Sequence, residues 1–156
     1  MDAMKSLIAA ALMLPAIAYP ADYGVELHGH AWHRDVGPFN ERNPGLGLFA
    51  RQDTLYLHAG GYKNSFYKPS FYVAAEWLPL QSRWIDAGIG GGVATGYQGY
   101  QGDASVAPGG YIPIHVKIPE LSKDLFLVIR AVPPLKYHGK SITNGLTTAS
   151  LGWQWK

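Results

Sequence analysis

Hydrophobic and polar positions alternate along most of the chain, in segments of about ten residues. Alternation with a period of two indicates strands with one apolar face, and about ten residues is the length that a tilted strand needs to cross a bilayer. We therefore expect an all-β fold. The predicted strands, eight in number, lie in 23–32, 45–51, 55–62, 70–78, 84–95, 111–118, 125–132 and 143–155.

The connections between these strands alternate in length, which indicates their topology. The short ones are 52–54, 79–83 and 119–124, and the longer ones are 34–44, 63–69, 96–110 and 133–142. This alternation is typical of an antiparallel up-and-down transmembrane barrel, with short turns at one end and longer loops at the other. Aromatic residues near the strand ends fit an interfacial girdle: Tyr62, Trp77, Trp84, Tyr111, Trp153 and Trp155.

The polar faces of the strands distinguish a membrane barrel from a soluble one, because both kinds alternate in the same way. Few Lys and Glu residues, which solubilise a water-facing wall, occur on these faces. A polar lumen inside an apolar wall therefore fits better than the alternative, a secreted lipocalin-like binder. Because buried charges need partners, we predict one internal network. Its members would be Glu26, Glu76, Asp86 and Arg130.

The first residues have the pattern of an export signal. Lys5 precedes an apolar run over 7–18, which ends in the small-x-small sequence Ala-Ile-Ala that a signal peptidase needs. The run is too short to cross a bilayer. We expect 1–18 to be a removable signal peptide, with a second candidate cleavage point after Ala21, and 19–156 to form one outer-membrane barrel domain.

Composition excludes several classes of function. The chain has 156 residues, of which 47% are hydrophobic and 15% charged, as suits one domain with a single core. A formal net charge of +2 is too small to suggest a nucleic-acid partner. The absence of cysteine excludes a disulfide scaffold, a thiolate metal site and a cysteine nucleophile.

Several short segments together resemble the PagP family of outer-membrane lipid A palmitoyltransferases. In chain order they are Trp32-His33-Arg34, Phe39-Asn40-Glu41-Arg42, Lys63-Asn64-Ser65-Phe66, Glu76-Trp77-Leu78-Pro79, Tyr111-Ile112-Pro113 and Val132-Pro133. The resemblance implies a protein of the Gram-negative outer membrane that transfers an acyl chain from a phospholipid to lipid A. We expect a monomer whose partners are these membrane lipids, with no cofactor and no metal.

In that family, a His on the first strand and an Asp-Ser pair in the second outer loop are required for acyl transfer. The matching positions here are His33, Asn64 and Ser65, so an amide replaces the acidic residue. An amide can orient a neighbour by hydrogen bonds but cannot act as a carboxylate base. The resemblance implies a catalytic site of His33 and Ser65 with Asn64. The replacement favours the alternative, a non-enzymatic barrel with a structural, adhesion or envelope-protection role.

Without the resemblance, the same residues have an ordinary structural interpretation. His33 would end a strand, and Ser65 would cap a turn beside Lys63 and Lys68. If they do act together, direct transfer is favoured over a covalent serine nucleophile, because the sequence has no nucleophile elbow.

Two histidines of the first predicted strand, His28 and His30, share a face at strand spacing. They would form a metal pair if Glu26 or Glu76 joined them. A hydrogen-bonded lumen network is the favoured interpretation, because a metal site needs a third well-placed ligand.

Prolines and glycines suggest where the wall opens. Four prolines lie near the strand ends on the loop side: Pro44, Pro113, Pro133 and Pro134. Each lacks the backbone N–H that would pair with the neighbouring strand, so each leaves a gap in the hydrogen bonding of the sheet. The PagP family is thought to admit its lipid substrates through gaps of this kind. Small residues on one face of the fifth strand would either leave a slot for an acyl chain or relieve crowding: Gly88, Gly90 and Gly92.

Overall fold

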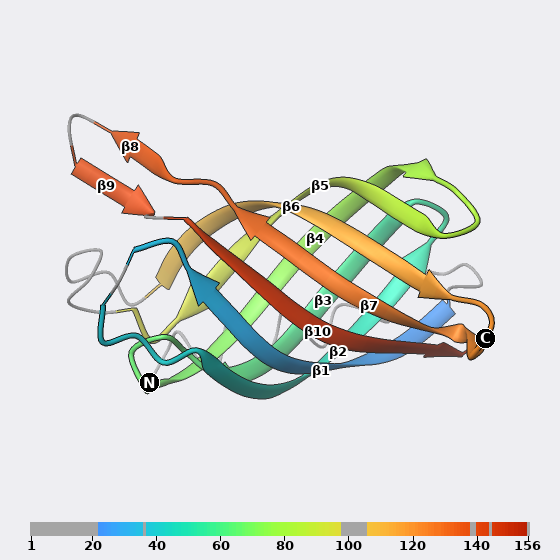
Figure 1. The fold of residues 1–156 in the computed structure, drawn as a ribbon, viewed down its shortest axis with the longest axis horizontal. Coiled ribbons are helices and arrows are strands. Elements are labelled where there is room, and N and C mark those ends of the chain that lie inside the picture. The colour runs from blue at the N-terminus through green and yellow to red at the C-terminus, as the bar shows by residue number, and fades with distance from the viewer. Residues whose placement is uncertain (1–21, 36, 98–105, 138–139, 144, 156) are drawn as a thin grey trace.

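The computed structural model describes residues 22–35, 37–97, 106–137, 140–143 and 145–155. The predicted signal peptide lies outside these residues. The barrel strands are β1 (Asp22–His33), β2 (Arg42–Gln52), β3 (Leu55–Lys63), β4 (Pro69–Gln81), β5 (Ile85–Thr95), β6 (Val106–Ile118), β7 (Ser122–Val132) and β10 (Leu146–Trp155) (Figure 1). Sequential strands pair antiparallel and β10 pairs with β1, which confirms the predicted eight-stranded antiparallel barrel. Within the described residues, no helix has the length and hydropathy to cross a membrane.

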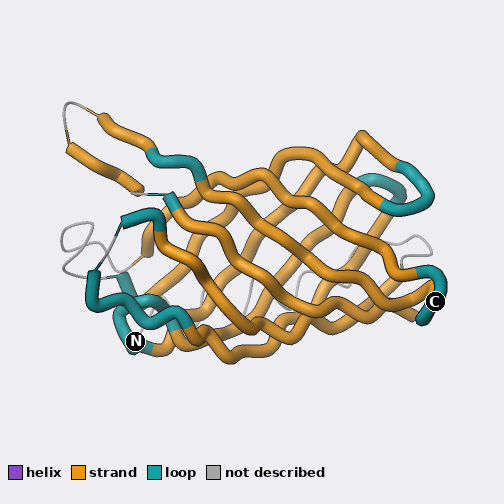
Figure 2. Tube along the Cα trace, viewed as in Figure 1, coloured by secondary structure: helices purple, strands orange, loops and turns teal. Residues whose placement is uncertain are grey.

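The connections alternate in length, as predicted. The short turns lie at one end of the barrel, the turn end, in 53–54, 82–84 and 119–121. The longer connections follow β1, β3, β5 and β7, whose last residues lie at the opposite end, the loop end (Figure 2).

The last of these connections contains a small hairpin, where the sequence analysis predicted only a loop. β8 (Leu135–Tyr137) pairs antiparallel with β9 (Lys140–Thr143), and the hairpin extends away from the barrel at the loop end (Figure 1). The final barrel strand therefore begins at Leu146 and not at Thr143. The alternation around Thr143 belongs to the hairpin.

The barrel wall separates apolar from ionisable side chains. Large hydrophobic side chains such as Leu48 and Ile89 are 57% and 63% exposed on the outside. Glu26 and Glu76, which point inward, are each 1% exposed. The predicted apolar outer wall around enclosed ionisable side chains is therefore confirmed, although the lumen also contains apolar side chains.

The aromatic residues assigned to a girdle divide between the two sides of the wall. Four of them are exposed on the outside, as expected: Trp77, Trp84, Trp153 and Trp155. Tyr62 and Tyr111 instead line the lumen, so the prediction was wrong for these two. Each lies an even number of residues from an inward-facing histidine, His58 or His115, and side chains two residues apart on a strand share a face.

A β-bulge in β1 changes which residues face the lumen. The pairing of β1 with both neighbours shifts between His28 and His30. His28 faces inward, where its Nε2 lies 2.9 Å from the hydroxyl of Tyr72. The ring of His30 instead packs on the exposed Trp32, with 4.5 Å between ring centroids. The prediction that the two histidines share a face was therefore wrong, because a bulge inserts one extra residue into the alternation.

The bulge also determines where β1 directs its last residues. Plain alternation would place Ala31 on the outer face with Leu27, but Ala31 is 2% exposed, whereas Trp32 is 51% exposed. After the bulge, therefore, odd-numbered residues face inward. This shift turns His33 toward the interior of the loop end.

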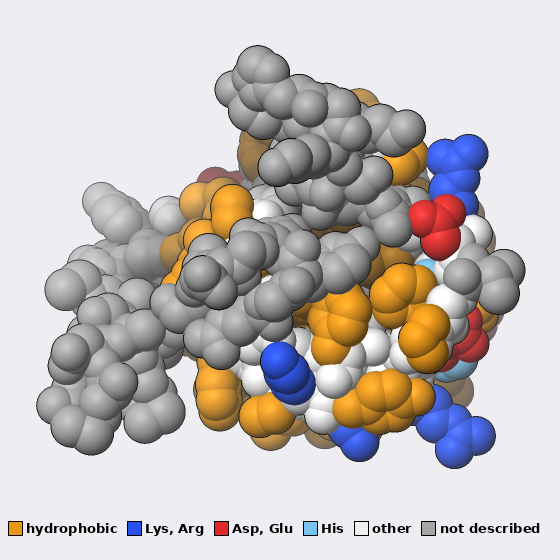
Figure 3. Space-filling view, turned by 90° about the vertical axis from the view of Figure 1, so that its left-hand side faces the viewer, with side chains coloured by type: hydrophobic (Ala, Val, Ile, Leu, Met, Phe, Trp, Pro, Cys, Tyr) orange, Lys and Arg blue, Asp and Glu red, His pale blue; other side chains and the backbone are white. Residues whose placement is uncertain are grey.

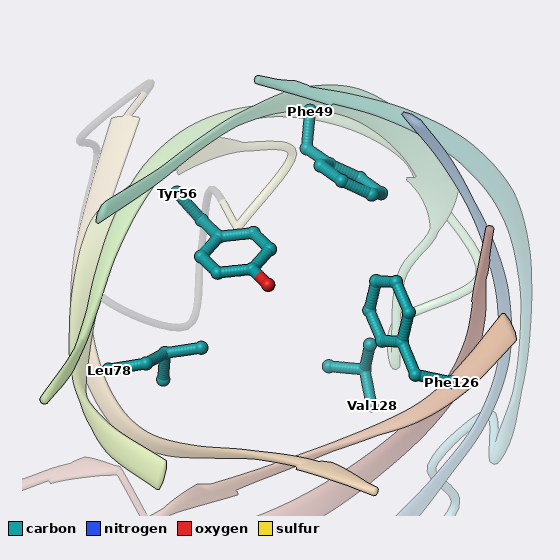
Figure 4. Close-up of a cluster of buried hydrophobic side chains, with 5 residues drawn as sticks. All are labelled: Phe49, Tyr56, Leu78, Phe126 and Val128. Carbon is teal, nitrogen blue, oxygen red and sulfur yellow. The ribbon is translucent and has the colours of Figure 1, made fainter. Parts of the chain in front are cut away.

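An apolar cluster fills the lumen nearer the turn end. Its five side chains come from four strands and point toward one another across the barrel (Figure 4): Phe49, Tyr56, Leu78, Phe126 and Val128. Each is at most 6% exposed. The barrel is thus closed by packed side chains at this level.

A layer of charged side chains lies next to this cluster, toward the middle of the lumen. Arg130 donates from both terminal guanidinium nitrogens to Glu26, with 2.9 Å between Nη2 and Oε2, and from Nε to Glu76 at 2.6 Å. His115 Nε2 lies 2.8 Å from Glu76. The ring of His58 lies between the carboxylates, 3.5 Å from Glu26 and 3.3 Å from Glu76. The predicted network is confirmed for Glu26, Glu76 and Arg130.

Asp86, the fourth predicted member, belongs to a separate ion pair. Its buried carboxylate lies 2.6 Å from Nζ of Lys117, near the turn end. Lys117 stands close to Asp86 on the adjacent strand, and its long side chain supplies a full positive charge without Arg130. The prediction was therefore wrong for Asp86.

Candidate active site at the loop end

The predicted His and Ser come together at the rim of the barrel. Nε2 of His33, the last residue of β1, lies 2.7 Å from Oγ of Ser65, in the loop after β3. β1 and β3 are separated by β2, so this contact depends on the fold of the two loops. When the hydroxyl donates, Nε2 of the imidazole is the acceptor, which is the form that a general base requires.

Asn40 connects the two loops beneath this pair. Its backbone N–H donates to the carbonyl of Ser65 at 2.8 Å, and its side-chain amide donates to the carbonyl of Asn64 at 3.1 Å. In addition, the amide of Asn43 donates to the carbonyl of Lys63 at 2.8 Å. These bonds fix the position of Ser65 relative to the end of β1.

Asn64 stabilises the loop and does not contact the His33 ring in the described geometry. Its amide nitrogen donates to Oγ of Ser70 at 3.0 Å and to the carbonyl of Gly96 at 2.9 Å. Its oxygen accepts the backbone N–H groups of Phe66 at 2.9 Å and Lys68 at 3.0 Å. The side chain is 0% exposed, and its hydrogen-bonding positions are occupied. The structure thus brings His33 and Ser65 together but directs the Asn64 side chain elsewhere.

A series of aromatic contacts leads away from the imidazole of His33. The ring of Phe39 stacks on that of His33, with 4.5 Å between centroids and 16° between planes. Phe66 meets Phe39 edge-on at 6.0 Å, and Tyr97 meets Phe66 in the same way. Sequence reasoning assigned these three no role in the site. Phe39 and Phe66 stand inside the family-like segments, but sequence alone does not show which loop residues stack.

The hydroxyl of Tyr97 ties this aromatic group to the barrel wall. It lies 2.9 Å from the hydroxyl of Tyr62 on β3. Burial raises the pKa of Tyr97, so its hydroxyl stays protonated and neutral. The aromatic group is therefore anchored by an uncharged hydrogen bond.

A cavity of about 240 Å³ lies inside the barrel between this pair and the charged layer. Ser65 lines it at the loop end, and Arg130 lines it at the level of the charged layer. Much of the remaining lining is small and apolar, including Ala31, Ala107 and Ala149. The cavity thus offers an apolar space directly beside the Ser65 hydroxyl.

Glycines contribute to this space in two ways. A Cβ at Gly88, Gly90 or Gly92 would lie closer than 3.0 Å to atoms of a neighbouring strand. These three glycines therefore relieve crowding, although Gly92 also lines the cavity. By contrast, a Cβ at Gly109 of β6, which also lines the cavity, would meet no atom within 4 Å.

The wall is incomplete beside the cavity. Within the described part of the chain, β6 pairs with β7 only from Ile112 onward, opposite Ala131, so 106–111 has no partner on that side. β7 ends at Val132, and Pro133 and Pro134 follow. Cavity-lining residues lie on both sides of this opening, Pro108 and Gly109 on β6 and Val132 on β7.

Basic residues accompany the apolar ones at the loop end. In the view onto this end, hydrophobic side chains are seen with Lys and Arg side chains mostly toward the edge (Figure 3). The described cationic residues in or next to the two loops of the site are Arg34, Arg42, Lys63 and Lys68.

The described residues contain no group of three or more His, Cys, Asp or Glu arranged to hold a metal ion. The alternative of a metal pair formed by His28 and His30 does not fit the bulge, because the two side chains lie on opposite faces of β1.

A scan of the chain against protein-family models finds no match. A search of curated proteins finds no significant match either.

Proposed function

We propose that this protein is an outer-membrane barrel that transfers an acyl chain from a phospholipid to lipid A at His33 and Ser65. One observation carries the proposal: the 2.7 Å contact between imidazole and hydroxyl lies at the mouth of an apolar cavity. The ordered PagP-like segments support the same function, since they include both residues.

A membrane location is supported by the outer wall. Exposed apolar side chains lie all around the barrel, and exposed aromatic residues lie toward both ends: Tyr23, Trp77, Trp84, Trp153 and Trp155 toward the turn end, and Trp32, Tyr67 and Phe71 toward the loop end. Two aromatic belts around an apolar band are typical of outer-membrane barrels. The closed ring leaves no strand edge along most of its height, as lipid requires.

The reaction follows from the geometry of the pair. Nε2 of His33 accepts the proton of the lipid A hydroxyl as its oxygen attacks the ester carbonyl of the phospholipid. Once Nε2 takes this proton it no longer accepts from Ser65, whose hydroxyl would then donate to the oxyanion that forms. When the carbonyl re-forms, the original ester C–O bond breaks, and the imidazolium returns the proton to the departing lysophospholipid oxygen. One ester is made, one is broken, and no cofactor is consumed.

The cavity provides a place for the donor's acyl chain. Each methylene group transferred from water to an apolar site contributes about 0.8 kcal/mol, although exchange from lipid contributes less. The main benefit of the cavity is therefore orientation, because a chain held beneath Ser65 presents its ester at the rim. The opening between β6 and β7 would let the chain enter sideways from the membrane.

A non-enzymatic barrel is the second candidate, and two observations favour it. Asn64 replaces the acidic residue that the family uses, and Nδ1 of His33 is buried without a hydrogen-bond partner among the described residues. In this case the same scaffold would serve a structural, adhesion or envelope-protection role.

The test is to express the full chain in a Gram-negative host under membrane stress and weigh lipid A by mass spectrometry. We expect an added acyl mass with the wild-type chain and its loss with His33→Ala, because the general base is removed. Trp32→Ala is the control, since Trp32 is next to His33 on the same strand but is 51% exposed on the outside. If wild type adds no mass although folded barrel is present, the non-enzymatic candidate replaces the proposal.

A further inference from the structure

We propose that Phe39 is a positioning residue, which holds the imidazole of His33 at the angle that directs Nε2 toward Ser65. In this role it replaces the acidic partner that usually orients a catalytic histidine. The consequence for catalysis rests on the proposed acyl transfer, whereas the consequence for ring orientation does not.

The imidazole needs such support because hydrogen bonds hold it on one side only. Nε2 bonds to Ser65, but Nδ1 is buried without a partner among the described residues. The Asn64 side chain is occupied within its own loop. A ring held at one atom is free to tilt about that bond.

The stack with Phe39 removes this freedom. The two rings are nearly parallel, 16° apart, with 4.5 Å between centroids. Stacked aromatic pairs contribute about 0.5–1.5 kcal/mol beyond the area they bury. An uncharged ring can therefore fix the plane of the imidazole without a carboxylate.

Two features determine where the ring of Phe39 lies. On one side, Phe66 and then Tyr97 connect it by edge contacts to Tyr62 on the barrel wall. On the other side, Gly37 leaves room for its ring, because a Cβ at position 37 would lie 2.7 Å from Cε2 of Phe39. A methyl group at position 37 would therefore displace the ring without altering its chemistry.

Two readouts test the proposal on the full chain folded in detergent. The first is the NMR signal of the His33 ring in histidine-labelled protein, assigned with His33→Ala. Phe39→Leu and Gly37→Ala should both move this signal, because they remove or displace the stacked ring. Phe39→Tyr should retain it.

The second readout is the rate of acyl transfer from phospholipid vesicles to purified lipid A. Misplacement by about 1 Å can cost about a hundredfold, so we expect Phe39→Leu to lower kcat at least tenfold with little change in KM. Phe39→Tyr should restore the rate. Phe71→Leu, the same change at an exposed outer-wall position, should leave it unchanged.

The two readouts separate the failure of each claim. If the His33 signal is the same in Phe39→Leu as in wild type, the positioning role is wrong whatever the activity. It is also wrong if the signal moves but kcat stays constant. If wild type transfers no acyl chain while the signal moves as expected, the proposed function fails and the orienting contact stands.

Discussion

Asn64 stands at the position of the acidic residue in the PagP-like segment, but its side chain bonds to Ser70 and Gly96 and not to His33. A carboxylate in its position could not donate to the carbonyl of Gly96, which Asn64 does at 2.9 Å. The amide is therefore matched to its loop, and its effect on Ser65 is exerted through the backbone. The Asn64 side chain therefore does not orient the imidazole of His33, whose ring stacks on Phe39. The space beside Ser65 is in turn shaped by small lining residues such as Gly109.

Gly109 offers a direct test of the cavity. Replacing it with Met should fill part of the open space that its missing side chain leaves, so that a shorter acyl chain is transferred or transfer is lost. The mass added to lipid A measures the chain length. Gly110→Met is the matched control, because the neighbouring position faces outward and its nearest atom is 3.8 Å from the Cβ. Equal effects of both changes would contradict an acyl chain in the lumen.

At the level of elements, the alternation of the sequence predicted every barrel strand, with ends that differ from the observed ones by at most five residues, as at the start of β6. A period of two is a local property of the sequence, so it identifies a strand without knowledge of the strands that pair with it. The bulge between His28 and His30 could not be identified in this way, since the residues around it remain compatible with plain alternation. The faces of β1 were therefore predicted correctly before Gly29 and wrongly after it. The pairing of His33 with Ser65 was reached from the family-like segments, and alternation would have directed His33 outward.

The bulge can be tested by cysteine labelling, since the chain has no native cysteine. In the folded protein in detergent, His30→Cys should react with a bulky maleimide, whereas Ala31→Cys should be protected. The reason is that the bulge turns position 30 outward and position 31 into the lumen. Leu48→Cys and Val128→Cys provide the exposed and buried references, and unfolding should make all four reactive. Faster labelling at position 31 than at position 30 would mean that β1 alternates regularly through this segment and has no bulge.

At the level of the whole molecule, the lumen is arranged in layers along the barrel axis. An apolar cluster lies nearer the turn end, the charged layer follows, and the cavity opens toward the loop end. Sequence predicted the charged members as a class, because ionisable residues on inward faces must find partners. It did not predict their grouping, since the pairing of Asp86 with Lys117 depends on the register of β5 and β6. The charged layer supports the base of the cavity, so its stability affects the site.

Arg130 should be the most sensitive residue of this layer. Replacing it with Met leaves Glu26 and Glu76 buried without their shared cation, and breaking a buried pair in this way costs about 3–5 kcal/mol. Denaturant unfolding in lipid vesicles measures the loss. Combining Arg130→Met with Glu26→Gln and Glu76→Gln should recover much of it, because no uncompensated charge remains. Lys117→Met should cost less, because only one buried carboxylate, that of Asp86, loses its partner and Lys117 itself is 32% exposed. A loss for Arg130→Met no larger than for Lys117→Met would mean that the layer does not hold the barrel together.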